Sequence, residues 1–370
     1  MVKTQLSALD INYLLKELKF LVNSRLDKIY HPSKKELILQ FYVSGKGKQQ
    51  LLINAGNYLY LTSFKSPSQT PSEFCMYLRK KLTNSRLIEI NQLEFERIIE
   101  FKFQTKQETF SLIFEMFSKG NIILIKDNKI LSAVEYQKYS TRIIKPKENY
   151  IHPKKELNFL ELTQTGLKKL LSHTLKESIV KSLAIDLGLG GIYSEEVCLL
   201  SKINKIKKPD ELDDKEIKLL FESLKSIKSK KLEPIIVYEN NTIKQAVPFK
   251  LNLFKNLNQK TFKTFSEALE EFFSQQIPIE QLKYQKQITK SKKIIEKQIQ
   301  HLEELKQQEK LNKEKAELLY KNYKLIKEIL EELKQISKKH NWKEIQEKLK
   351  GHKLIKEVIP KEKNIVIELK

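Results

Sequence analysis

The sequence predicts an α+β protein with an antiparallel, β-rich N-terminal domain carrying helices, a mainly helical second domain, and long coiled-coil-like helices. Three observations lead to this prediction. Short turns separate β-prone segments up to about residue 150, helical periodicity follows from residue 156, and a lysine- and glutamate-rich pattern begins after residue 276. A chain of 370 residues is long enough for two or three domains with separate cores.

The N-terminal segment predicts an amphipathic helix over residues 7–30, because its apolar side chains recur at three- and four-residue spacing. Ser7 is the expected N-cap and Asp10 the expected N3 residue of a capping box. A second helix is expected over residues 71–82. The expected strands cover residues 36–43, 50–54, 57–62, 94–104, 109–116, 121–125 and 130–136. Strands joined by such short connections cannot be parallel, so residues 1–150 are expected to form one antiparallel α+β domain.

A polar, proline-bounded linker over residues 145–155 marks the first expected domain boundary. The second domain is expected over residues 156–276. Its expected elements are helices up to residue 230, interrupted by a glycine-rich segment, then a hairpin of residues 233–238 and 242–253, and a short helix over 265–273.

The C-terminal part has a different composition. Residues 281–370 contain 24 Lys and 14 Glu but no Asp or Arg, which is a net charge of +10. Ile288, Ile295 and Leu302 keep the seven-residue step of a coiled coil. We therefore expect a coiled-coil-like helical arm over residues 280–355, with apolar positions that await a partner, and a short strand segment over 356–370.

Composition and charge narrow the class of protein. Cys75 and Cys198 alone cannot build a disulfide-rich fold, and this fits a reducing cytosol. The sequence has no secretory signal and no apolar run near the ~20 residues of a membrane span, so a cytoplasmic protein is expected. Lys plus Arg is 69 and Asp plus Glu is 46, a net charge of +23. This charge indicates either a generally lysine-rich surface or a polyanionic partner, nucleic acid or membrane.

Residues with catalytic or metal-binding patterns are scarce. None of the six histidines forms a pair at metal-ligand spacing, and no nucleophile elbow, Walker loop or zinc motif is present. We therefore expect no metal, no cofactor and no enzyme activity. A site assembled from carboxylates far apart in sequence is the remaining alternative.

Two groups of residues are candidates for phosphate binding. Gly188, Gly190 and Gly191 lie between predicted helices, where backbone N–H groups can bind an anion; a tight turn that needs positive φ is the alternative. The second group is basic, and solvated surface charge is its alternative. It consists of Arg79, Lys80 and Lys81 on the second helix, Arg86, and Lys46 and Lys48 in a glycine turn, with Tyr42 and Tyr77 as possible aromatic neighbours.

Glu96 and Arg97 open a predicted strand and therefore point to opposite faces, so they should not pair with each other. Arg97 would share a face with apolar residues, where an arginine needs an anionic partner or a place at the sheet rim. Asp10 is one candidate partner. A purely structural role for Asp10 in the helix cap is the alternative.

Six segments together resemble the NFACT family of ribosome-associated quality-control factors, called RqcH in bacteria and NEMF in animals. The segments are residues 7–11, 24–30, 71–80, 95–99, 115–124 and 187–191. They occur in the family's order, with the coil-like region after them, and the phrase around Gly120 is most similar to archaeal members.

The resemblance implies an N-terminal domain similar in fold to that of formamidopyrimidine-DNA glycosylases, followed by a helix-hairpin-helix domain. It also implies binding to the large ribosomal subunit that holds a stalled peptidyl-tRNA, with recruitment of aminoacyl-tRNA for mRNA-independent tailing of the nascent chain. The ribosome would perform the peptidyl transfer. No membrane partner is implied.

The resemblance also suggests which residues act. Asp10 matches the family's acidic residue that is needed for tailing, and Glu96-Arg97 matches its Asp-Arg pair, with glutamate in place of the usual aspartate. The chain resembles the first half of such a factor, so a separate C-terminal half could supply a returning coil helix and an RNA-binding domain.

Two other functions are the alternatives. One is a nucleic-acid-binding protein or repair enzyme of the related glycosylase fold, although the start Met1-Val2-Lys3 lacks that family's catalytic proline and glutamate. The other is a surface adhesin, since some bacterial relatives are named as fibronectin-binding proteins.

Overall fold

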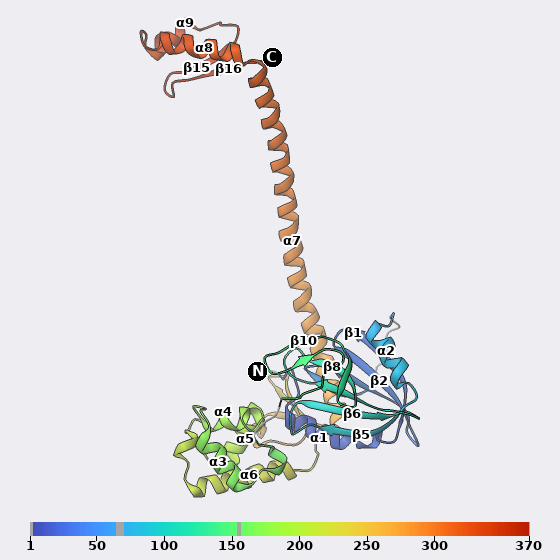
Figure 1. The fold of residues 1–370 in the computed structure, drawn as a ribbon. Helices are drawn as coiled ribbons and strands as arrows, with labels where there is room; N and C mark the ends of the chain where they lie inside the picture. The colour runs from blue at the N-terminus through green and yellow to red at the C-terminus, as the bar shows by residue number, and fades with distance from the viewer. Residues whose placement is uncertain (1–2, 64–69, 154–156, 370) are drawn as a thin grey trace. The chain divides into compact units, whose positions relative to one another are not determined.

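A nine-stranded antiparallel sheet forms most of the N-terminal region. The structure is a computed structural model that describes residues 3–63, 70–153 and 157–369, without the side chains of residues 276–290 and 292–293. The strand order is β4-β3-β2-β1-β5-β6-β7-β8-β9, which confirms the predicted antiparallel α+β class. The strands are β1 (Arg25–Ser33), β2 (Glu36–Val43), β3 (Gly47–Asn54), β4 (Tyr58–Thr62), β5 (Arg86–Gln92), β6 (Ile98–Gln104), β7 (Thr109–Glu115), β8 (Asn121–Lys126) and β9 (Lys129–Ala133) (Figure 1).

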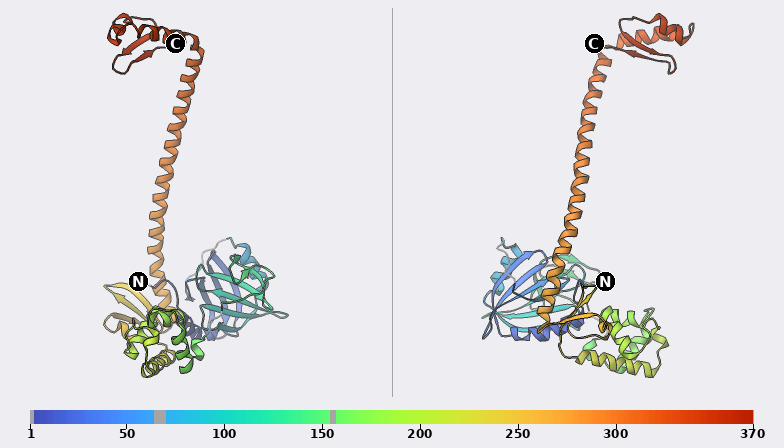
Figure 2. Two further views of the ribbon diagram at one scale, coloured as in Figure 1. Left: turned by 60° about the vertical axis from the view of Figure 1, so that its left-hand side comes forward. Right: turned by 180° about the vertical axis from the view of Figure 1, so that it is seen from behind.

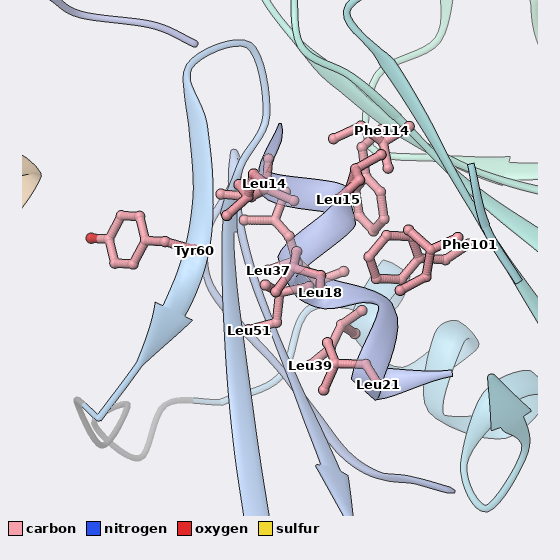
Figure 3. Close-up of a cluster of buried hydrophobic side chains, with 14 of the residues drawn as sticks. Leu14, Leu15, Leu18, Leu21, Leu37, Leu39, Leu51, Tyr60, Phe101 and Phe114 are labelled. Atoms are coloured by element: carbon pink, nitrogen blue, oxygen red, sulfur yellow. The ribbon is translucent and has the colours of Figure 1, made fainter. Parts of the chain in front are cut away.

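Helix α1 (Ala8–Leu18) supplies much of the core beneath this sheet. The predicted capping box is confirmed: the Asp10 amide donates to Ser7 Oγ, and the Ser7 amide donates to the Asp10 carboxylate. Leu14, Leu15 and Leu18 project from α1 into the sheet. Figure 3 shows them between side chains of β2 and β3 on one side and of β6 and β7 on the other. A second helix, α2 (Glu73–Leu82), packs against β1.

The prediction that the first helix continues to residue 30 is wrong. A single 3-10 turn, η1 (Lys19–Leu21), follows α1, Asn23 takes a positive φ of 71°, and β1 begins at Arg25. A bulge between Leu26 and Lys28 inserts one extra residue, so Leu26 and Ile29 are both buried. This gives a strand the three-residue spacing of a helix.

The strand expected over residues 94–104 begins only at Ile98. Glu94 and Phe95 have φ values of 46° and 55° in a turn between β5 and β6, and Glu96 and Arg97 complete that turn. Strand β5 itself was not predicted. Because the turn reverses the chain, Glu96 and Arg97 lie at the end of the sheet.

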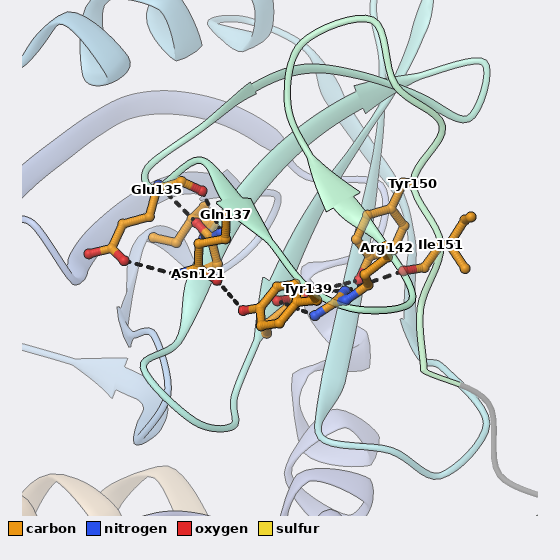
Figure 4. Close-up of polar contacts among 9 residues, drawn as sticks. Asn121, Glu135, Gln137, Tyr139, Arg142, Tyr150 and Ile151 are labelled. Atoms are coloured by element: carbon orange, nitrogen blue, oxygen red, sulfur yellow. Dashed lines mark hydrogen bonds and ion pairs between the residues drawn. The ribbon is translucent and has the colours of Figure 1, made fainter.

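A buried ion pair joins the end of β7 to the chain that follows the sheet. Glu115 is 1% exposed and binds the Arg142 guanidinium through both oxygens. Tyr150 Oη donates to the same carboxylate at 3.1 Å, and Figure 4 shows Arg142 and Tyr150 beside each other. Strands β10 (Gln137–Lys138) and β11 (Ile143–Ile144) form the short hairpin that carries Arg142 toward β7.

Four helices and a three-stranded sheet follow. The elements are η2 (Phe159–Glu161), α3 (Gln164–His173), α4 (Ile179–Ile185), α5 (Gly191–Ser201), η3 (Pro209–Glu211), α6 (Asp214–Ser229), β12 (Ile235–Glu239), β13 (Thr242–Val247), η4 (Asn252–Phe254) and β14 (Asn258–Thr261). In both views of Figure 2 the helices, coloured green to yellow, gather in one group. Tyr13 of α1 joins this group, because its Oη donates to the carbonyl oxygen of Ile227 at 2.8 Å.

The chain divides into two compact units, Met1–Pro278 and Ile279–Lys370, and helix α7 (Phe265–Lys321) has residues in both. Glu17 of α1 caps the start of α7, since its carboxylate accepts from the amides of Phe265 at 2.6 Å and Ser266 at 3.1 Å. The short helix expected over residues 265–273 is therefore the first part of a 57-residue helix.

The second unit has a small core of its own beyond α7. Its elements are α8 (Tyr323–Ile336), α9 (Trp342–Lys348), β15 (Ile355–Ile359) and β16 (Asn364–Ile367). Ile295, Ile299 and Leu302 of α7 are each about half exposed. The side chain of Ile288, the predicted linker residues 154–155 and residue 156 of the expected second domain lie outside the described residues. The domain boundaries remain predictions. In the part of the chain that the structure describes, no helix combines the length and apolar character of a membrane span.

Candidate functional site

Six of the predicted site residues line one cavity of about 1090 Å³. The N-terminal segment, the first turn of α1, the turn before β6, the α4–α5 hairpin and the β12–β13 sheet surround it. The six residues are Asp10, Glu96, Arg97, Gly188, Gly190 and Gly191. We call this space the Arg97 cavity. Residues from three distant parts of the sequence therefore meet at one place.

Asp10 is the buried centre of the cavity wall, with 1% of its surface exposed. One carboxylate oxygen accepts from Tyr193 Oη at 2.6 Å. The other accepts from the Ser7 amide at 2.7 Å and the Ser7 hydroxyl at 2.8 Å, and it forms an ion pair with Lys3 at 2.8 Å. A carboxylate with this many partners is fixed in orientation and holds the N-terminal segment against α1 and α5.

Lys3 is almost as buried as its partner, since its side chain is 5% exposed. Its ammonium group also donates to the carbonyl oxygen of Ala246 in β13. Burial lowers the pKa of Lys3, and the nearby Asp10 carboxylate opposes that shift. Lys3 thus ties the N-terminal segment to both α1 and β13.

Arg97 lies at the rim of the cavity and is half-buried. Its Nη1 donates to Gln5 Oε1 at 2.6 Å. The expected pairing of Arg97 with Asp10 is therefore wrong, because Lys3, Ser7 and Tyr193 surround Asp10 instead. Burial lowers the pKa of the Arg97 guanidinium, and Glu96 opposes this through its negative charge.

A separate set of contacts fixes the turn that carries Glu96 and Arg97. The side-chain amide of Gln92 donates to the carbonyl oxygens of Ala8 at 2.8 Å and Glu96 at 2.9 Å. Phe95 is 2% exposed and packs on Phe159, with ring centroids 4.7 Å apart. The turn is therefore anchored to the first residue of α1 and to the helical group.

The glycine hairpin has the positive φ values that the tight-turn alternative expects, and its binding of phosphate stays a prediction. Gly188 and Gly190 have φ values of 76° and 80°, which other residues rarely adopt. The Gly190 amide donates to the carbonyl oxygen of Ala184 at 3.3 Å, so the hairpin uses this donor internally. A Cβ at Gly190 would lie 3.4 Å from Ser7 Cβ, whereas one at Gly191 would meet no atom within 4 Å.

The predicted basic residues lie away from this cavity. Lys46 and Lys48 line a different cavity, of about 930 Å³. Arg79 is used inside the fold, because its guanidinium donates twice to the carbonyl oxygen of Ile29, at 2.9 and 2.7 Å. Lys80 is exposed on α2. The structure therefore does not gather these residues with the Arg97 cavity.

Sequence reasoning missed Lys3, Gln5 and Tyr193 as parts of the site. None of them belongs to a spacing pattern, since each contacts a residue on another element. The Ser7–Asp10 capping box was the nearest available signal, because it marks where the N-terminal segment meets α1. Among the described residues, no three His, Cys, Asp or Glu side chains cluster as a metal site would require.

A family model described as NFACT N-terminal and middle domains matches residues 7–367 of this sequence. The chain belongs to the NFACT family. The range that the family model matches includes all segments around the Arg97 cavity except the residues before Ser7.

Two NFACT relatives carry names that concern ribosome quality control. The archaeal Rqc2 homolog aRqcH of Methanocaldococcus jannaschii is 31% identical over 372 residues, covering 95% of this chain and 55% of that protein. The human ribosome quality control complex subunit NEMF is 24% identical over 379 residues, covering 93% of this chain and 35% of that protein. The chain thus spans about half or less of these relatives.

Solved structures share the fold of this NFACT chain. The N-terminal part of the fibronectin/fibrinogen-binding protein from Streptococcus suis aligns with a TM-score of 0.60 at 24% identity. It covers 73% of this chain and 100% of that chain. The fibrinogen-binding protein from Staphylococcus aureus aligns with a TM-score of 0.59 at 20% identity, covering 72% and 98%.

Proposed function

We propose that this NFACT chain is a ribosome quality control factor. In this proposal it binds the large ribosomal subunit that holds a stalled peptidyl-tRNA and recruits aminoacyl-tRNA for mRNA-independent tailing of the nascent chain. The single observation that carries the proposal is the convergence of Asp10, Glu96 and Arg97 at one cavity. The names of the archaeal and human relatives support the ribosomal setting.

Arg97 and Asp10 have different roles in this proposal. Arg97 is half-buried at the rim, with Gln5 as its hydrogen-bond partner, so its guanidinium can exchange that partner for a tRNA phosphate or base edge. Asp10 is too buried to touch RNA directly and acts as a positioning residue. It holds Ser7 and Lys3, which lie on either side of Gln5 in the chain.

The glycine hairpin supports the cavity through its backbone conformation. Gly190 has a φ of 80° beside Ser7, and α5 begins at Gly191. In the proposed complex, Gly188 and Gly191 lie beside the RNA backbone. The ribosome performs peptidyl transfer, so the chain itself is not an enzyme, and it acts in the cytoplasm.

The proposed assembly also includes a helix that covers α7. Ile295, Ile299 and Leu302 expose about half of their surfaces along one stretch of that helix. A second apolar helix, on the same polypeptide or on a separate C-terminal half, would bury them.

Co-sedimentation tests the proposal. Large ribosomal subunits that carry or lack peptidyl-tRNA are mixed with the chain, pelleted, and any bound tRNA is sequenced. We expect sedimentation that depends on peptidyl-tRNA and that weakens in Arg97→Ala but not in Lys215→Ala, which removes one exposed charge from α6. Equal sedimentation with both kinds of subunit would contradict the proposal.

A further inference from the structure

A row of exposed side chains crosses one end of the large sheet, away from the Arg97 cavity. The register pairs Lys48 of β3 with Tyr42 of β2, Tyr42 with Arg25 of β1, and Arg25 with Arg86 of β5. Gln104 of β6 continues the row beside Arg86. All five side chains are exposed, and none is acidic.

Strand alternation explains why these side chains share the outer face. For the members of the row other than Lys48, one neighbour in sequence belongs to a buried row on the other face, in the main core. That buried row consists of Phe41, Leu26, Leu87 and Phe103. The core therefore fixes the backbone positions of Tyr42, Arg25, Arg86 and Gln104.

Arg25 and Arg86, two residues of like charge, lie directly opposite each other on β1 and β5. The Leu26 amide donates to the carbonyl oxygen of Ser85, and the Leu87 amide donates to that of Ser24, each at 2.9 Å. These bonds flank the two arginines and make them a non-hydrogen-bonded pair, the class with the shorter Cα separation of about 4.5 Å. Like charges directly opposite each other are destabilising.

The described part of the chain, residues 3–63, 70–153 and 157–369, places no carboxylate in an ion pair with Arg25 or Arg86. The neighbour that Arg25 does have is aromatic, because its guanidinium carbon lies 6.0 Å from the centroid of the Tyr42 ring. An external anion between the two guanidinium groups would remove the repulsion.

The row as a whole has the chemistry of a single-stranded nucleic-acid surface. Tyr42 is 51% exposed, so its ring can receive a base, and it lies between Lys48 and Arg25, whose side chains can bind phosphates. Adjacent strands are about 4.8 Å apart, so Lys48 and Arg86 are separated by about 14 Å. That span accommodates several nucleotides. An acidic peptide would also use the cations but would gain nothing specific from the exposed ring.

We propose that Lys48, Tyr42, Arg25 and Arg86 form a second nucleic-acid surface that binds an unpaired strand, with a base stacked on Tyr42 and phosphates on the three cations. Arg97 precedes β6, whereas Gln104 ends it, so this surface lies about 20 Å along the strand from the Arg97 cavity. The choice of RNA over DNA as the natural strand rests on the proposed function.

Titration of the chain with a fluorescent 12-nucleotide oligoadenylate, as RNA and as DNA, tests this surface. We expect Tyr42→Ala to weaken binding roughly 5- to 150-fold, and Tyr42→Phe, which keeps the ring, to leave it unchanged. Arg25→Ala/Arg86→Ala should lower the slope of log K against log salt by about 0.7 for each phosphate that the two arginines neutralise. Tighter binding of the RNA strand would identify the ligand as RNA, and equal binding would identify it as any single strand.

The control variant is Lys215→Ala/Lys218→Ala, which removes the same charge from exposed positions of α6. Equal losses of affinity in both double variants, or full binding by Tyr42→Ala, would overturn the proposal. Thermal unfolding checks the fold, and Arg86→Ala should not lower Tm because it relieves repulsion. Oligonucleotide binding without ribosome co-sedimentation would contradict only the proposed function. Co-sedimentation without oligonucleotide binding would contradict only the proposal of this surface.

Discussion

Tyr193 donates a hydrogen bond from its Oη to Asp10 Oδ1 at 2.6 Å, and this bond joins α5 to α1 across 183 positions of sequence. Both residues are almost fully buried. The contact places the glycine hairpin against the N-cap of α1, and through Ser7 it determines where Gln5 meets Arg97. The shape of the Arg97 cavity therefore depends on one buried polar cluster.

Replacing Tyr193 by phenylalanine removes this bond and leaves its core packing intact. We expect the free energy of unfolding to fall by about 1–3 kcal/mol, because a buried carboxylate oxygen loses a partner. Denaturant titration measures the change. Tyr136→Phe is the matched control, since Tyr136 is 59% exposed and should show no effect. Equal stability of the two variants would contradict the role assigned to Tyr193.

Lys3 and Asp10 should behave as a coupled pair. Asp10→Leu alone leaves a buried ammonium group without its counter-charge, which costs about 3–5 kcal/mol. The double variant Lys3→Met/Asp10→Leu should recover part of that loss. A double-mutant cycle by chemical denaturation measures the coupling, and simple additivity of the two single changes would disprove it.

Tyr13 should make stability depend on alkaline pH. Burial raises the pKa of Tyr13 to about 12 in the folded chain, whereas an unfolded tyrosine has a pKa of about 10. Between these values the unfolded chain has released the proton and the folded chain still binds it, so stability falls as pH rises, by at most about 1.4 kcal/mol per pH unit. This contribution is fully present below pH 10.

Unfolding curves of the wild type and Tyr13→Phe between pH 9 and 12 test this dependence. The difference between the two isolates Tyr13, because every other titrating group is common to both. The difference should be constant up to about pH 10 and shrink above it. A constant difference over the whole range would show that Tyr13 does not contribute.

Two neighbouring glycines provide a test of the hairpin. Gly190→Ala places a side chain at a φ of 80° and against Ser7, so it should destabilise the chain by about 1–3 kcal/mol and weaken peptidyl-tRNA-dependent sedimentation. Gly191→Ala occupies open space at the first position of α5 and should be neutral or slightly stabilising. If the two variants behave alike, the positive φ at Gly190 has no role.

Local sequence signals predicted the parts of this site that depend on near neighbours. The capping box of Ser7 and Asp10 is a three-residue pattern, and the φ values of Gly188 and Gly190 follow from residue type. The resemblance to the NFACT family indicated Asp10, Glu96 and Arg97 as one functional group, whereas the glycine hairpin was a separate candidate that only the fold brings to the same cavity.

Tertiary contacts determine the end of the first helix and the partners of Lys3 and Arg79, which local sequence patterns do not predict. The bulge at Leu26 and Lys28 gives a strand the spacing of a helix, so periodicity alone extended the first helix too far. Lys3 pairs with Asp10 only because β13 and α1 enclose both residues. Arginine is a residue type that often binds phosphate, yet the Arg79 guanidinium donates its hydrogen bonds to the backbone of β1.

The claim that tRNA lies at the Arg97 cavity can be tested with a photo-crosslinking residue. Benzoylphenylalanine at Thr4, an exposed residue of the cavity wall, is irradiated on large subunits with peptidyl-tRNA and aminoacyl-tRNA, and the crosslinked RNA is sequenced. Benzoylphenylalanine at Leu175, which is 98% exposed between α3 and α4, is the control. We predict tRNA crosslinks from position 4 that Arg97→Ala abolishes; ribosomal RNA alone from position 4, or the same tRNA yield from position 175, would contradict the account.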